Sequence, residues 1–370
     1  MNIRENFLAI LNYENYDKVP LLHFGFWPET LRKWADEGHF AEKIIHDSAE
    51  NGSPGSRYVA KLLGFDQDYE VAGGSNGMDP HFKTKVLFEE DGFQHVMNSY
   101  GVIELIKPGV RSIPSAIDHT LKTRADWERD YKWRYQYADD RVDAAFLASL
   151  PRPEERETAL GLHVGSLYGH IRDVLGIEGI SYLYADDEEL YEEIINTVGS
   201  LCYRVTEKIL SFGRKFDFAH YWEDICFKNG PLVIPSVFDA LVGPWYKKIS
   251  DLLNAHGINI ISVDCDGMID ALLPIWLKNG VNTMFPIEVG TWNASIAPWR
   301  EKYGRALRGV GGMNKNVFAL DYDAVDAEIE RLKPLINLGG FIPCPDHRIP
   351  PNAKWENVQY YCERFRKEFQ

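Results

Sequence analysis

INIISVDCDGMIDALLPIWLKNGVNTMFPIEV, residues 258–289, contains the pattern that decides the fold. It begins with the apolar run Ile258 to Val263, continues as the helical pattern Ile269 to Asn279 closed by Gly280, and ends in a second apolar run, Thr283 to Val289. Runs that are apolar at consecutive positions are typical of strands buried on both faces. Two such strands joined through a helix predict parallel pairing.

The same alternation extends outward from this stretch. Five more short apolar runs are predicted as strands: Val19 to Phe26, Leu160 to Ser166, Phe216 to Trp222, Leu307 to Gly311 and Gly340 to Cys344. Three more helical patterns are Asp187 to Phe212, Ser236 to His256 and Asp323 to Asn337. This order implies an α/β fold with a parallel sheet, and 370 residues suit a barrel of such units with insertions.

Residues 53–134 break this rhythm. The segment contains three stretches of alternating polarity separated by turns at Asp91-Gly92 and Tyr100-Gly101, which predicts an antiparallel hairpin, followed by a helical return over Lys132 to Asp140. The alternating stretches are Lys85 to Phe88, Gln94 to Asn98 and Val102 to Ile106. We expect an N-terminal hairpin and helix insertion that covers one end of the barrel, within a single domain of residues 1–370.

Composition limits the class of protein. Hydrophobic residues make up 45% of the chain, enough for a large core, and the net charge of −15 disfavours nucleic acid and anionic membranes as partners. The five cysteines are scattered without CxxC spacing, so no disulfide framework is expected. The first residues lack a signal-peptide pattern, and no apolar run approaches the roughly 20 residues of a membrane span. These features predict a cytoplasmic protein.

Polar residues gather where the predicted strands end, which is where barrels place reactive groups. They are His23, His163, Ser166, Glu223, Asp224, Asp264, Asp266, Glu288, Asp346 and His347. Asp264 and Asp266 are spaced by two on a strand, so they point to the same side and could bind a cation or share a proton. Alternatively, Asp266 caps the helix that follows. Of the adjacent pair Glu223 and Asp224 only one can face inward, and we expect Glu223.

The loop Pro343 to Pro351 contains four prolines and presents Asp346, His347 and Arg348 after the last strand. Prolines stiffen a loop, which makes it suited to hold a ligand or a proton donor. The aromatic end of the first strand, His23 to Trp27, could wall a pocket or simply pack in the core. Cysteines near strand ends could hold zinc with histidines, or could be small buried hydrophobic residues.

The chain resembles the uroporphyrinogen decarboxylase superfamily over nearly its whole length. The resembling segments are Leu162 to Gly169, Trp222 to Leu232, Val263 to Gly267, Val310 to Lys315 and Pro345 to Pro351. The resemblance implies a (β/α)8 TIM barrel. The decarboxylases of this superfamily hold an acidic tetrapyrrole with arginines after the first strand, whereas Leu22 to Glu29 contains none here. The resemblance therefore favours the corrinoid-linked methyltransferases.

Some of these methyltransferases bind zinc through a His-x-Cys-Gly step and a later Cys. This chain has Asp264, Asp266 and His347 at those positions, so a thiolate zinc site is not expected as such. The chain looks more like the methyltransferase component of O-demethylases. That similarity implies transfer of a methyl group from a methoxyaromatic substrate to the cob(I)alamin of a partner corrinoid protein.

The expected site combines the strand ends with this resemblance. The expected catalytic residues are Glu223, Asp264 and His347. The expected substrate-binding residues are His23, Phe26, Trp27, His163, Tyr168 and Trp222. A metal ion, with Zn2+ as the candidate, would be held by Glu223, Asp264, Asp266, Glu288 and His347.

Three other functions remain open at this point. A uroporphyrinogen-decarboxylase-like lyase would need cations in the pocket, for which Arg172, Arg308 and Arg348 are the candidates. A barrel that only binds a corrinoid or a small ligand would not depend on Glu223 or His347. Methyl transfer to a thiol or a pterin would need zinc on thiolates.

Overall fold

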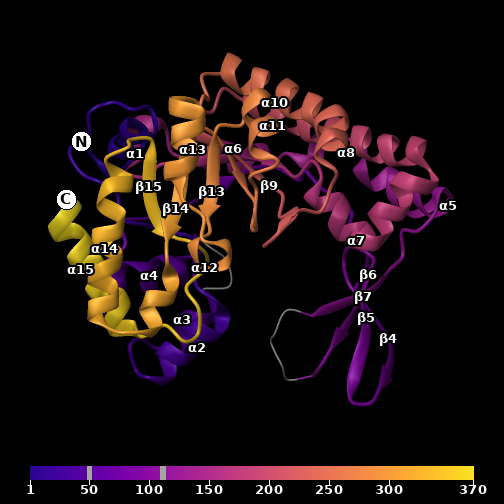
Figure 1. The fold of residues 1–370 in the computed structure, drawn as a ribbon. Helices are drawn as coiled ribbons and strands as arrows, with labels where there is room; N and C mark the ends of the chain where they lie inside the picture. The colour runs from indigo at the N-terminus through magenta and orange to yellow at the C-terminus, as the bar shows by residue number, and fades with distance from the viewer. Residues whose placement is uncertain (48–51, 109–113) are drawn as a thin grey trace.

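The computed structural model describes residues 1–47, 52–108 and 114–370 (Figure 1). Its centre is a parallel sheet of seven strands in the order β15-β14-β13-β12-β9-β8-β3. The strands are β3 (Val71–Ala72), β8 (Gly161–Gly165), β9 (Phe218–Trp222), β12 (Ile261–Asp264), β13 (Thr283–Ile287), β14 (Arg308–Met313) and β15 (Phe341–Pro345). All seven runs predicted as strands overlap a strand of this sheet or its closing strand, β1 (Leu22–His23).

The seven-stranded sheet closes into a barrel because β1 lies between its two edges. β1 pairs in parallel with β2 (Gln67–Asp68), which continues after two residues as β3. On the other side of β1, Phe26 bridges Ile349 in parallel just beyond β15. The amide of Ile349 donates to the Gly25 carbonyl at 3.1 Å, and the amide of Trp27 donates to the Ile349 carbonyl at 3.2 Å. The structure is therefore an eight-stranded (β/α)8 barrel, as expected.

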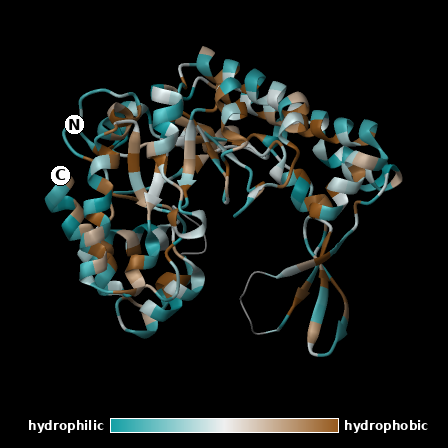
Figure 2. Cartoon of the chain, viewed as in Figure 1, coloured by the Kyte–Doolittle hydropathy of each residue, from teal (hydrophilic) through white to brown (hydrophobic). Residues whose placement is uncertain are grey.

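Helices surround the strands. They are α1 (Ile3–Leu11), α2 (Pro28–Asp36), α3 (Lys43–His46), α4 (Pro54–Leu63), α7 (Gly169–Asp186), α8 (Glu188–Ser211), α9 (Pro235–Val237), α10 (Gly243–Ala255), α11 (Leu273–Lys278), α12 (Val289–Trp292), α13 (Ile296–Tyr303), α14 (Tyr322–Ile336) and α15 (Trp355–Phe369). The long helices carry hydrophobic and hydrophilic residues side by side (Figure 2), as helices packed on a sheet do. Among the described residues, no helix combines the length and apolar character that a membrane crossing requires.

Predicted helices differ from the observed ones mainly at their starts. The pattern Asp187 to Phe212 corresponds closely to α8, and Asp323 to Asn337 corresponds to α14. The pattern Ile269 to Asn279 yields only the short helix α11, because Pro274 occupies the first turn and fixes the start there. The residues before it form the loop that leads away from β12, which is the loop that carries Asp266.

Between β3 and β8 the chain leaves the barrel. It forms an antiparallel sheet of β4 (Lys85–Glu90), β5 (Phe93–Met97), β6 (Val102–Ile106) and β7 (Ser115–His119), followed by α5 (Arg124–Asp126) and α6 (Ala144–Ser149). The predicted hairpin is present, and β7 adds a strand that was not predicted. Residues 54–72 are not part of this excursion, because α4 and β2–β3 belong to the barrel.

The four-stranded sheet stands out from the barrel on the side toward which β13, β14 and β15 point (Figure 1). The carboxyl ends of the barrel strands therefore open on the same side as this sheet. Closure of the sheet over the barrel stays a prediction. Short helical turns over Trp127–Tyr131 and Lys132–Tyr135 return the chain toward α8, in the place of the predicted helical return.

Candidate functional site

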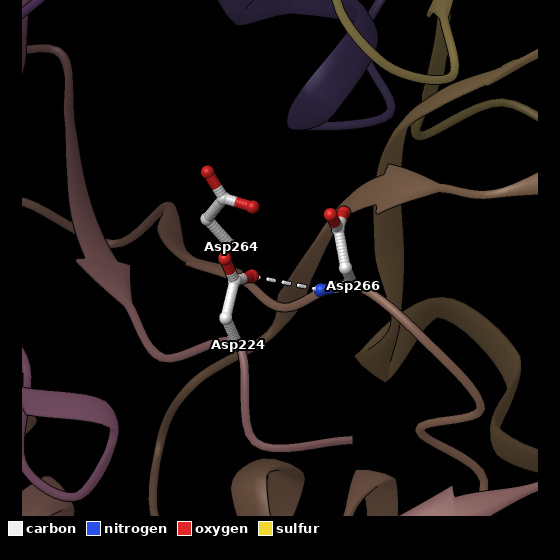
Figure 3. Close-up of side chains that lie close together, drawn as sticks. All are labelled: Asp224, Asp264 and Asp266. Carbon is white, nitrogen blue, oxygen red and sulfur yellow. Dashed lines mark hydrogen bonds between the residues drawn. The ribbon is translucent and has the colours of Figure 1, made fainter. Parts of the chain in front are cut away.

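Three carboxylates meet where β9 and β12 end (Figure 3). Asp264 is the last residue of β12, Asp266 follows it by two positions, and Asp224 follows the end of β9 by two. One carboxylate oxygen from each lies within 4.8 Å of the other two. The backbone amide of Asp266 donates to Oδ1 of Asp224 at 3.0 Å. Asp224 has a φ of 49°, and this left-handed conformation brings its carboxylate to Asp266.

This cluster is electrostatically unfavourable when fully ionised. Burial, followed by repulsion from Asp266, raises the pKa of Asp224 to about 6. Burial raises the pKa of Asp264 well above its usual range, and the charges of Asp224 and Asp266 raise it further. Carboxylates this close either share a proton or bind a cation. The three aspartates are therefore suited to hold positive charge at the barrel mouth.

Two imidazoles border the cluster. Nε2 of His347 lies 3.4 Å from Oδ2 of Asp266, and Nε2 of His220 lies 3.9 Å from Oδ2 of Asp264. Burial lowers the pKa of His220 to about 3, so this ring is uncharged. Its Nδ1 lies 2.8 Å from Oγ of Ser262, which accepts a hydrogen bond from the Tyr69 hydroxyl at 3.0 Å. These bonds fix the ring so that Nε2 faces Asp264.

Aromatic rings line the same region. Trp27 stacks on His347 with ring centroids 5.4 Å apart, and Phe24 meets His347 edge-on at 5.5 Å. Phe285 contacts Phe24 edge-on and stacks on Tyr69 at 4.4 Å. Asp264, Asp266, His347 and Trp27 thus form one continuous set of contacts, and their expected catalytic, metal-binding and substrate-binding roles stay predictions.

Glu223 is not part of the cluster, which corrects its expected catalytic and metal-binding role. Its side chain is fully buried at the start of α7, where it accepts the backbone amides of Leu167 at 2.8 Å, Tyr168 at 2.9 Å and Gly169 at 2.7 Å. The hydroxyls of Ser166 and Tyr246 donate to it as well. It caps a helix, and the inward position belongs to Asp224.

Glu288 lies beside the cluster but its oxygens have other partners. Oε2 accepts the amide of Gly267 at 2.5 Å, and Oε1 accepts the Thr291 hydroxyl at 2.6 Å. It holds the loop that follows Asp266, so the expected metal-ligand role of Glu288 gives way to a supporting one.

Three expected substrate contacts point elsewhere. His23 is buried between Phe26 and Phe65, and Phe26 packs on Trp34, so both belong to the core. Tyr168 is buried with its hydroxyl 2.9 Å from that of Tyr191. The first strand ends at His23, and Gly25, two positions later, has a φ of 105°, so Phe24 and Trp27 on either side of this turn face the site instead.

The remaining two expected contacts, His163 and Trp222, line a pocket of about 390 Å³ next to the cluster. Trp222 pairs in register with Asp264, and His163 pairs with His220, so the pocket adjoins the aspartates. Its other wall is the glycine-rich segment 74–78 that follows β3. This segment was not singled out from the sequence, although Gly73-Gly74-Ser75-Asn76-Gly77 is an evident glycine-rich turn.

Arg141 holds that segment in place. Its buried guanidinium donates to the carbonyls of Ser75 at 3.0 Å and Gly77 at 2.7 Å, and also to carbonyls of Asp79, Arg134 and Gln136. The Arg141 side chain thus binds carbonyls both before and after the four-stranded sheet in the sequence. These bonds hold the segment 74–78, which forms the pocket wall, in a fixed position.

We expect Arg141→Ala to lower the free energy of unfolding by about 3 kcal/mol, because it leaves several buried carbonyls without donors. Urea denaturation followed by circular dichroism measures this change. Arg129→Ala, which removes an exposed guanidinium paired with Asp126 and Asp130, is the matched control and should change stability little. Equal effects of the two variants would contradict the role of Arg141.

Two of the other functions considered from the sequence, a lyase and a methyl transfer that uses a thiolate zinc site, would need arginines or cysteines gathered at the barrel mouth. Arg308 donates to the Leu11 carbonyl at the start of β14, Arg172 pairs with Asp173 at 3.1 Å, and Arg348 lies over the Trp27 ring. These three arginines do not form a cationic ring for a poly-carboxylate. The one group of potential metal ligands that the described residues bring together consists of Asp224, Asp264 and Asp266, and it contains no cysteine, whereas a thiolate zinc site would need one.

Comparison with known proteins supports the fold. No family model matches the chain, and neither does the sequence of a curated protein. Among solved structures, the chain is similar to a methyltransferase from Methanosarcina mazei, with 13% identity, a TM-score of 0.59, and coverage of 100% of this chain and 99% of that one. A B12-independent methionine synthase from Shewanella sp. W3-18-1 matches at 11% identity and a TM-score of 0.47, over 95% and 99% of the two chains. At this identity the first likeness shows a shared fold.

Proposed function

We propose that the protein is a methyltransferase that moves a methyl group from a small methoxyaromatic compound to the cob(I)alamin of a partner corrinoid protein. The observation that carries this proposal is the cluster of Asp224, Asp264 and Asp266 with His347 at the barrel mouth, beside aromatic rings. The similarity in fold to a methyltransferase supports it. The alternative, a lyase acting on a carboxylated substrate, would have to use Arg172 and Arg348, of which Arg172 is paired with Asp173 and Arg348 lies over the Trp27 ring.

The chemistry requires positive charge at the ether oxygen. The bond between the methyl carbon and that oxygen breaks, the carbon bonds to cobalt, and the oxygen takes up a proton. A positioned acid typically accelerates such a step by about 10²- to 10⁴-fold. We assign this proton to Asp264, and the position of its carboxyl between the uncharged His220 and the other two aspartates supports that assignment.

A divalent ion is the alternative source of positive charge. Asp224, Asp264 and Asp266 would hold it, with His347 beside them, and this set of carboxylate oxygens and imidazole fits Mn2+ or Zn2+. When bound, such an ion would polarise the ether oxygen as a Lewis acid. In either case the aromatic rings hold the substrate while the cluster faces its oxygen.

The metal alternative makes its own prediction. We expect protein prepared without chelator to contain about one divalent ion per chain by elemental analysis, and Asp266→Asn to lose it. Asp270→Asn, which changes a carboxylate in the same loop that bonds to Trp299, is the control and should retain the ion. If elemental analysis instead finds almost no divalent ion in the protein, the positive charge at the ether oxygen must come from a proton.

The proposed function is tested by incubating the protein with a cob(I)alamin-loaded corrinoid protein and a panel of methoxyarenes. Formation of methylcobalamin, followed by its absorption spectrum, is the expected result. Absence of methyl transfer from every methoxyarene in the panel would overturn the substrate class.

A further inference from the structure

The pocket next to the acidic cluster has chemistry of its own. It is lined by Ser75, Asn76, Gly77 and Met78 from the segment after β3, by His81 and Tyr100 from the insertion, and by His163, Ser166, His170, Asp173 and Trp222 from the barrel. At about 390 Å³ it has the size of a small-molecule site. The pocket therefore has room for one ring-sized ligand with its substituents.

Two glycines of the pocket wall pack closely against neighbouring residues. A Cβ on Gly77 would lie 2.7 Å from Nε2 of His170, and one on Gly74 would lie 2.8 Å from the Arg141 carbonyl. Glycine is thus needed at both positions for the segment to lie against its neighbours. Together with the Arg141 clamp, this packing fixes the position of Asn76, which lies between the two glycines.

Asn76 presents an unsatisfied acceptor. Its side chain is largely buried, with 6% of the residue exposed. Nδ2 donates to the His163 carbonyl at 3.1 Å, and because a carbonyl only accepts, this bond fixes which end of the amide is the NH2 group. Oδ1 is left buried without a hydrogen-bond donor from any part of the chain that the structure describes. A buried acceptor of this kind needs a donor from a ligand or from water.

Two imidazoles near Asn76, those of His163 and His170, are uncharged. Burial lowers the pKa of His170 to about 4, with further lowering by nearby His81 and His163, and burial also lowers the pKa of His163. Nε2 of His170 is a second buried atom without a partner within the described residues. Neither ring supplies the positive charge that an anionic ligand would need.

The charged groups disfavour both ionic ligand classes. The described residues that line the pocket include no lysine or arginine, so a carboxylate or phosphate would have no ammonium or guanidinium group in its direct lining. The one lining carboxylate, Asp173, is already paired with Arg172 at 3.1 Å, so it is not free for a cation. An uncharged ligand with a hydrogen-bond donor fits this lining best.

We propose that this pocket binds an uncharged phenolic ring, whose hydroxyl donates to Oδ1 of Asn76 and whose face contacts Tyr100 and Trp222. This proposal rests on the proposed function and deepens it, since it restricts the substrate to methoxyphenols without a carboxylate or an amine. Trp222 lies beside Asp264 in the sheet, so a methoxy group next to the phenolic hydroxyl can extend toward the acidic cluster.

Isothermal titration calorimetry without a corrinoid protein tests the proposal. The ligands are 2-methoxyphenol, methoxybenzene, 4-methoxybenzoate and 4-methoxybenzylamine. We expect 2-methoxyphenol to bind about tenfold more tightly than methoxybenzene, the value of one buried hydrogen bond, and both ions to bind more weakly than the phenol. Equal binding of phenol and methoxybenzene, or tighter binding of either ion, would overturn the proposal.

Two variants localise the effect. Asn76→Ala should abolish the preference for the phenol over methoxybenzene, whereas Asn196→Ala, which removes an amide that accepts from Trp245 outside the pocket, should preserve it. A preference that survives Asn76→Ala would contradict the assigned contact. The ligand comparison on the unmodified protein remains decisive if Asn76→Ala does not fold.

This test separates the two proposals. Phenol-selective binding without methyl transfer would sustain the pocket assignment and overturn the proposed function. Methyl transfer from methoxybenzoates as readily as from methoxyphenols would sustain the function and overturn the pocket assignment.

Discussion

Asp264→Asn is expected to reduce the rate of methyl transfer by about 10²- to 10³-fold, comparable to the loss of one preorganised electrostatic contact in other enzymes. Asparagine keeps the shape of the side chain but removes its ability to give up a proton and weakens any bound cation. Asp264 is the central member of the cluster, since it faces His220 at 3.9 Å and lies within reach of Asp224 and Asp266. The measurement is kcat for methylcobalamin formation.

The stability of this variant provides the internal control. The folded protein raises the pKa of Asp264 because its charge is buried near other negative charges. Asparagine is neutral at every pH, so it removes the free energy that folding costs when this carboxyl is buried or takes up a proton, and the free energy of unfolding should be unchanged or increased. Loss of activity with unchanged or higher stability supports a catalytic role, whereas an unfolded variant would point to structure. Activity near that of the unmodified protein would contradict the proposed role.

Glu223→Ala is expected to have the largest effect on folding, lowering the free energy of unfolding by about 3–5 kcal/mol. The substitution removes the acceptor for three backbone amides at the start of α7 and for two hydroxyls, all inside the protein. Unpaired buried donors are costly because they have given up water without a replacement. Urea denaturation measures the change.

Glu189→Ala is the matched control for Glu223→Ala, because Glu189 is an exposed glutamate in the first turn of α8. We expect it to change stability little. If Glu223→Ala instead retained full stability and lost only activity, the capping role would be wrong and the expectation of a catalytic glutamate would return.

The sequence predicted the barrel where strands are uniformly apolar. β13 and β15 are fully buried and were recognised from their apolar runs. The second barrel strand was missed, because β2 and β3 are two residues each and include Gln67 and Asp68, which have no strand-like pattern. Gln67 is buried because its amide bonds to the backbone of Ala159, a long-range partner that local sequence does not indicate.

The sequence predicts the residues of the site that follow a regular strand and misses those that depend on an irregular backbone or on distant contacts. Asp264 and Asp266 were recognised because regular alternation holds up to the end of β12. The alternation of inward and outward side chains does not continue after Trp222. The left-handed backbone at Asp224 turns this side chain, and not that of Glu223, toward the cluster. His220 was overlooked although a signal existed: it lies two positions before Trp222 in β9, on the same face of the strand. Asn76 depends on contacts between distant segments and has no local signal.

The closure of the barrel through Phe26 and Ile349 has a consequence for biosynthesis. These residues lie near opposite ends of the chain, so a ribosome elongating at about 5–20 residues per second needs on the order of tens of seconds between them. During that interval the nascent chain exposes one unpaired edge of its first strand. Such an edge is a template for pairing with other polypeptides, so newly made protein should depend on chaperones until the eighth strand emerges.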